Sequence, residues 1–116
     1  MKTHKITKKK EFSYIFKNGN FINFNSFTIN YAEKLTHENN PSPRYGIIAS
    51  KKIGNAVKRN FAKRRVKALK NILNHSGKKE LDYVLIIKKK LLNTKFKALS
   101  IELEMALEKI KKKNNE

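Results

Sequence analysis

Cysteine and tryptophan are absent from this chain of 116 residues, and prolines number only two. The lack of cysteine excludes disulfides and thiolate metal sites. No apolar run approaches the roughly 18 residues that a membrane span requires. The basic N-terminus is not followed by the apolar segment of a signal peptide. We therefore expect a cytoplasmic protein that does not enter a membrane.

Acidic residues are also scarce, with nine Asp and Glu against 28 Lys and Arg, which gives a formal net charge of +19. An enzyme for a small neutral metabolite does not need such a charge, whereas a binder of nucleic acid or of an anionic membrane surface does. A membrane-surface helix would also need a broad apolar face free for lipid, and here that face is required for the core. The chain is long enough for one domain, which we expect to span residues 1–116.

Residues with catalytic or metal-binding chemistry are present but scattered. His4, His37 and His75 lie far apart, and no pair has the spacing of metal ligands. Asp82 has no evident acid–base partner in the sequence, and no serine stands in the turn motif of a hydrolase nucleophile. We therefore expect a binding surface with no catalytic residue, metal or cofactor of its own.

The most informative segment is Lys51–Lys70, which holds nine basic residues and no acid. Gly54-Asn55 within it is typical of a turn followed by a helix N-cap, because an Asn side chain can accept a hydrogen bond from a free helix amide. The pattern predicts one helix from about Ala56 towards Leu73, and Gly77 fits its end.

Residues placed at about 100° intervals sort this helix into two halves. The apolar half includes Val57, Phe61, Val66 and Leu69, with Lys58 and Arg65 as exceptions that we expect to be peripheral. The other half is cationic, and its members are Arg59, Asn60, Lys63, Arg64, Lys67, Lys70 and Asn71. A solvated basic helix is one interpretation. Because no acid relieves the repulsion, a polyanion bound to this half is the better one.

The rest of the chain predicts an α+β fold in the order α-β-β-β-α-β-α, a two-layer α/β sandwich on a mixed sheet of about four strands. A basic arm (1–7) and a frayed tail (111–116) flank it. The expected elements outside the basic helix are a helix at 8–18, strands at 21–24, 27–32, 45–50 and 81–87, and a helix at 95–112. The strands at 45–50 and 81–87 precede and follow the basic helix along the chain, and they should pair in parallel.

Aromatic residues mark a second candidate surface. Phe12, Ile15 and Phe16 form a stripe on the first helix, and the strand at 27–32 alternates apolar with polar residues, so that one sheet face is polar. Aromatic rings beside a polar sheet face suit the stacking of single-stranded nucleic acid. Packing in the core explains Phe12 and Phe16 equally well.

The run Lys51-Lys52-Ile53-Gly54-Asn55-Ala56-Val57-Lys58-Arg59-Asn60, followed by Lys63-Arg64, resembles the RNR motif of the bacterial ribonuclease P protein component. The first helix, from Lys8 to Gly19, is similar to that family too. The resemblance implies a fold like a ribosomal-protein domain with a left-handed βαβ crossover. It also implies a 1:1 partnership with a catalytic RNA that uses Mg²⁺ to remove the 5′ leader of precursor tRNA.

The resemblance assigns two groups of residues to RNA. Those expected to contact the catalytic RNA are Lys51, Lys52, Asn55, Arg59, Asn60, Lys63, Arg64 and Lys67. Those expected to contact the precursor-tRNA leader are Lys8, Phe12, Phe16, Thr28 and Asn30. The chain differs from the usual family pattern at Asn30, Phe61 and Lys67. A ribosomal-type RNA-binding protein without an enzymatic partner is the alternative function.

Overall fold

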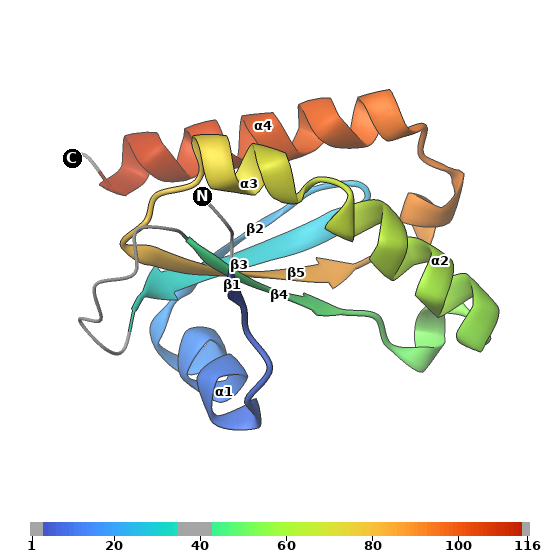
Figure 1. Ribbon diagram of the computed structural model, residues 1–116, viewed down its shortest axis with the longest axis horizontal. Helices are drawn as coiled ribbons and strands as arrows, with labels where there is room; N and C mark the ends of the chain where they lie inside the picture. Colours follow the sequence, from blue (N-terminus) through green and yellow to red (C-terminus); the bar gives the residue numbers. More distant parts are fainter. Residues whose placement is uncertain (1–3, 35–42, 115–116) are drawn as a thin grey trace.

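The computed structural model describes residues 4–34 and 43–114 (Figure 1). The strands are β1 (His4–Lys5), β2 (Asn20–Asn23), β3 (Phe27–Glu33), β4 (Arg44–Ile48) and β5 (Leu81–Ile87). The helices are α1 (Lys9–Asn18), α2 (Ala56–Lys67), α3 (Lys70–Ser76) and α4 (Phe96–Asn114), with short 3₁₀ turns η1 (Lys51–Ile53) and η2 (Lys89–Asn93). Within these residues no helix is long and apolar enough to cross a membrane.

The sheet is mixed, as predicted, with the strand order β1-β4-β5-β3-β2. β4 and β5 pair in parallel, and α2 and α3 lie in the connection between them along the chain. β3 pairs antiparallel with both β5 and β2. The four predicted strands are all present, with ends shifted by one or two residues except at β5, which matches. Because β5 lies at the centre of the order, its residues are buried on both faces.

The prediction of a basic arm at 1–7 is wrong from His4 onward. His4 and Lys5 form β1, which pairs in parallel with the start of β4. The Ile6 amide donates to the Tyr45 carbonyl at 2.6 Å, and the Ile6 side chain is buried. Pairing covers the open edge of β4, and one apolar side chain fixes the segment on the core.

Helices cover the sheet unequally (Figure 1). α3 and α4 lie on one face, where they pack with Ile29, Tyr83 and Leu85 in the larger apolar cluster. α1 lies on the opposite face and buries Ile15 against Ala32 and Val84 in a smaller cluster. α2 stands at one end of the sheet, so most of its circumference is open.

The single helix predicted from Ala56 to Leu73 is in fact two helices. α2 ends at Lys67, and the Leu69 amide donates to the Val66 carbonyl at 2.9 Å, a tighter turn than an α-helix makes. Beyond the bend α3 packs beside α4, and Leu69 and Leu73 are both buried in the larger apolar cluster. Helical periodicity continues through such a bend, so the sequence did not reveal it.

The C-terminal helix is longer than predicted. α4 continues to Asn114, so Lys111–Lys113 are helical instead of forming a frayed tail, and residues 115–116 lie outside the described part. Glu102 of α4 accepts hydrogen bonds from the backbone amide and the hydroxyl of buried Ser26 at 2.9 and 3.0 Å. This contact ties the β2–β3 turn to the helix layer.

Candidate nucleic-acid interface

The start of α2 is set by Gly54-Asn55, as predicted. Gly54 has φ +148°, a conformation that L-residues with side chains rarely adopt. The Asn55 side chain accepts a hydrogen bond from the Lys58 amide at 3.0 Å and so caps the helix. Arg59 donates through Nη1 to the Gly54 carbonyl at 3.1 Å. The turn therefore fixes both the direction of the helix and the position of the Arg59 side chain.

We call the residues predicted to meet the catalytic RNA the α2 strip. All lie on η1, on the turn or on α2, and none forms an ion pair with an acid among the described residues. Arg59 and Lys63 are half-buried and the other members are exposed; they are Lys51, Lys52, Asn55, Asn60, Arg64 and Lys67. Unpaired cations on one helix suit phosphates.

Lys5, which no pattern in the sequence indicates, is brought to this strip by β1. Repulsion by Lys67 lowers the pKa of the Lys5 amine, with smaller contributions from burial and from Lys63. Lys5 therefore lies within electrostatic reach of Lys67 and Lys63. No local pattern could have indicated this, because the pairing of β1 with β4 places Lys5 there.

The apolar half of α2 packs less completely than predicted. Ala62 and Val66 are fully buried, but Val57 is 74% exposed and Phe61 37% exposed. Arg65, which we expected to lie outside the RNA-binding cations, bonds within the fold: its Nη2 donates to the Thr94 carbonyl at 2.6 Å. Since α2 stands beyond the end of the sheet, only part of this half has a surface to pack on.

The second predicted surface lies where α1 crosses the sheet, and we call it the α1 face. Ile15 is buried there, Phe12 is half-buried and Phe16 is 43% exposed. The ring of Phe12 rests on Gly46 of β4, where an added Cβ would lie 2.5 Å from Phe12 Cε1. Phe12 is therefore largely a packing residue, and Phe16 is the ring more open to a ligand.

Thr28 and Asn30 are on the same face as α1, because Ala32 in the same alternating set packs against Ile15. Thr28 donates to the Asn23 side chain at 2.6 Å. Asn30 is 8% exposed, and its amide nitrogen has no hydrogen-bond partner. Lys8, the remaining predicted residue, is exposed just before α1.

Phe21, which the sequence pattern does not mark as a site residue, also belongs to this face. It pairs with Asn30 across β2 and β3, and paired residues project from the same side of a sheet. With 61% of its side chain exposed, Phe21 is the most open ring on the α1 face. Its exposure follows from strand register, which the sequence pattern of a four-residue strand does not specify.

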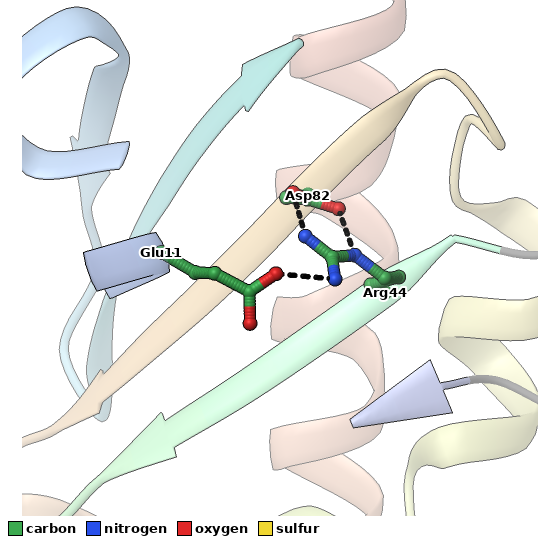
Figure 2. Close-up of polar contacts among 3 residues, drawn as sticks. All are labelled: Glu11, Arg44 and Asp82. Carbon is green, nitrogen blue, oxygen red and sulfur yellow. Dashed lines mark hydrogen bonds and ion pairs between the residues drawn. The ribbon is translucent and has the colours of Figure 1, made fainter. Parts of the chain in front are cut away.

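An ion-pair cluster fixes α1 on the sheet (Figure 2). Arg44 on β4 donates to both oxygens of Asp82 on β5, at 2.9 and 2.7 Å. It also pairs with Glu11 on α1 at 2.5 Å. These hydrogen bonds and charges raise the pKa of the Arg44 guanidinium, so it stays charged. Asp82 is buried. Its partner, which was not evident in the sequence, is Arg44 on the neighbouring parallel strand β4.

A family model named Ribonuclease P matches residues 1–111. The chain belongs to the ribonuclease P protein family. The ribonuclease P protein component of a Nitratiruptor species is 36% identical over 106 residues, covering 90% of both chains. That of Shouchella clausii is 34% identical over 110 residues, covering 95% of this chain and 88% of its own.

Solved structures of the family share the fold. The RNase P protein of Staphylococcus aureus matches with a TM-score of 0.77 at 26% identity, covering 95% of this chain and 97% of its own. That of Thermotoga maritima has the same TM-score at 24% identity, covering 91% and 96%. Membership in the ribonuclease P family implies an RNA partner, and it supports the ribonuclease P interpretation over a ribosomal-type protein without an enzyme.

Proposed function

We propose that the chain is the protein subunit of ribonuclease P and binds the catalytic RNA through the α2 strip. The observation that carries this proposal is the capped, acid-free helix at the end of the sheet. Its cations face solvent without ion-pair partners in the described chain. Lys51, Arg64 and Lys67 are open for phosphates, while Asn60 offers an amide for a base or a sugar.

The α1 face is the proposed site for the single-stranded 5′ leader of precursor tRNA. Phe16 and Phe21 offer exposed rings for stacking bases, and Lys8 supplies a nearby charge. Thr28 and Asn30 supply polar side chains on the same face of β3. The Glu11–Arg44–Asp82 cluster holds α1, and with it Phe16, at a fixed place above the strands.

The chemistry of leader removal belongs to the RNA in this proposal. Among the described residues, no three His, Asp or Glu side chains gather where they could hold a metal ion. Mg²⁺ would therefore be held by the RNA, and this chain would bind, orient and neutralise charge. A 1:1 complex with the catalytic RNA and a cytoplasmic location remain predictions.

Reconstitution at low Mg²⁺ tests the proposed function. Added protein should raise cleavage of a precursor tRNA by the cognate catalytic RNA, because the cations reduce the RNA's need for free metal. The control is the same RNA with an unrelated protein of similar charge. No rise in cleavage above that control would contradict the proposal. Equal affinity of the complex for precursor and mature tRNA would favour a general RNA-binding protein.

A further inference from the structure

An apolar groove lies beside the α2 strip, between α2 and η2. Val57, Phe61 and Leu92 supply its apolar lining, and Lys58, Arg64 and Lys89 supply the charged part. We call these six residues the Phe61 groove; its volume is about 430 Å³, within the range of small-ligand sites. Val57 and Phe61 are two of the seven large apolar side chains that are exposed in the described chain.

The Phe61 ring is held in place by the neighbouring Arg65 side chain. The Arg65 guanidinium carbon lies 5.4 Å from the centre of the Phe61 ring and 5.9 Å from that of Phe96. Its hydrogen bond to the Thr94 carbonyl fixes the guanidinium between the two rings. An aromatic ring that is already ordered but still open to solvent loses little conformational entropy when a flat ligand stacks on it.

The charges around the groove define the kind of ligand. Its lining holds three cations and no acid, so it suits a flat apolar group attached to an anion. A nucleotide has both parts: a base that stacks on an aromatic ring, and a phosphate that pairs with Lys or Arg. A second copy of this chain, with a net charge of +19, would be repelled.

We propose that the Phe61 groove binds an unpaired base of the RNA that lies on the α2 strip. Arg64 belongs both to the α2 strip and to the lining of the groove. A single RNA strand can therefore contact the strip and the groove at consecutive nucleotides. The base stacks on Phe61, and Lys58, Arg64 and Lys89 bind the flanking phosphates. This inference rests on the proposed function, and it adds a base contact to a surface otherwise made for phosphates.

A tryptophan at position 61 gives a direct test, because the chain contains no other tryptophan. Addition of the catalytic RNA to the Phe61→Trp protein should quench its emission, as expected when a base stacks on the indole. The control is Met105→Trp, which is 52% exposed in the wild type and lies nine residues beyond Phe96 along α4. Its emission should change little. Binding without quenching at position 61 would overturn the proposal.

Affinity measurements test the same contact without a reporter. Phe61→Leu should weaken binding of the catalytic RNA by roughly 5- to 150-fold, the range expected for one lost stacked base. Its salt dependence should match that of the wild type because no phosphate contact is lost. Phe61→Tyr, which keeps the ring, should bind normally. Wild-type affinity in Phe61→Leu, or a changed salt dependence, would overturn the stacking role. Failure of the wild type itself to bind would instead reject the proposed function.

Discussion

The α2 strip and the α1 face are built in opposite ways. The strip comes mainly from one continuous segment, Lys51–Lys67, whose geometry is set by a glycine turn and an Asn55 cap. The α1 face combines α1 with β2, β3 and β4, and its order depends on contacts between residues far apart in sequence. The α2 strip, built from one segment, can present many charges side by side. The α1 face, built from several elements, can form a narrower site around exposed rings.

This difference implies that the two surfaces respond to different substitutions. Damage to long-range contacts should disturb the α1 face and leave the strip folded, because the α2 cap and turn do not depend on α1. Loss of single cations should lower the affinity of the α2 strip for the catalytic RNA in small steps, and it should leave α1 in place. Substitutions that act on one surface at a time can test this separation.

Arg44→Met should have the largest effect, because it leaves the buried Asp82 carboxylate without its partner. We expect a loss of about 3 kcal/mol in the free energy of unfolding, measured by urea denaturation at neutral pH. Precursor binding should fall more than catalytic-RNA binding, since α1 is released. The matched control is Glu11→Gln, which removes only a more exposed partner and should cost less than about 1 kcal/mol. Equal losses at both surfaces would argue against separate sensitivities.

Gly46→Ala should act through Phe12. The new methyl group would lie 2.5 Å from Phe12 Cε1, so the ring must move and α1 with it. We expect about 1 kcal/mol of destabilisation and a several-fold loss of affinity for the precursor, with catalytic-RNA binding unchanged. Adding Phe12→Leu to this variant should restore part of the stability. A second substitution that makes stability worse would show that the clash lies elsewhere.

Lys67→Met should have a small effect that is specific to the strip. Repulsion by Lys67 is the main reason that the pKa of Lys5 is lowered. Its removal should therefore raise the pKa of Lys5 towards the ordinary value of a lysine, as followed by NMR titration of the side chain. Bound RNA should raise the same pKa, because phosphates favour the charged amine. A Lys5 pKa that does not change in Lys67→Met would show that Lys5 does not lie beside the α2 strip.

The same difference explains what could be predicted from the sequence. The Asn55 cap, the cationic half of α2 and strand β5 depend on neighbours within a few residues, and the structure confirms them. The partner of Asp82 and the exposure of Phe21 depend on which strands pair and in which register. Periodicity carries no such information.

Two further errors concern the ends of local patterns. A helical repeat continued across Ala68–Leu69, although α2 ends at Lys67 and a separate helix, α3, begins at Lys70 and packs beside α4. Phe61 fits an apolar stripe, but α2 extends past the sheet and leaves its ring half open. In both cases the sequence identifies an apolar side chain without showing what covers it.

The most direct test compares Arg64→Ala with Phe16→Ala in the reconstituted complex. Two quantities are measured for each: affinity for the catalytic RNA over a salt series, and the ratio of affinities for precursor and mature tRNA. Arg64→Ala should lower the salt slope of log affinity by about 1 and leave the ratio unchanged. Phe16→Ala should lower the ratio roughly 5-fold and leave the slope unchanged. If both variants change the same quantity, the protein does not hold its two RNAs on separate surfaces.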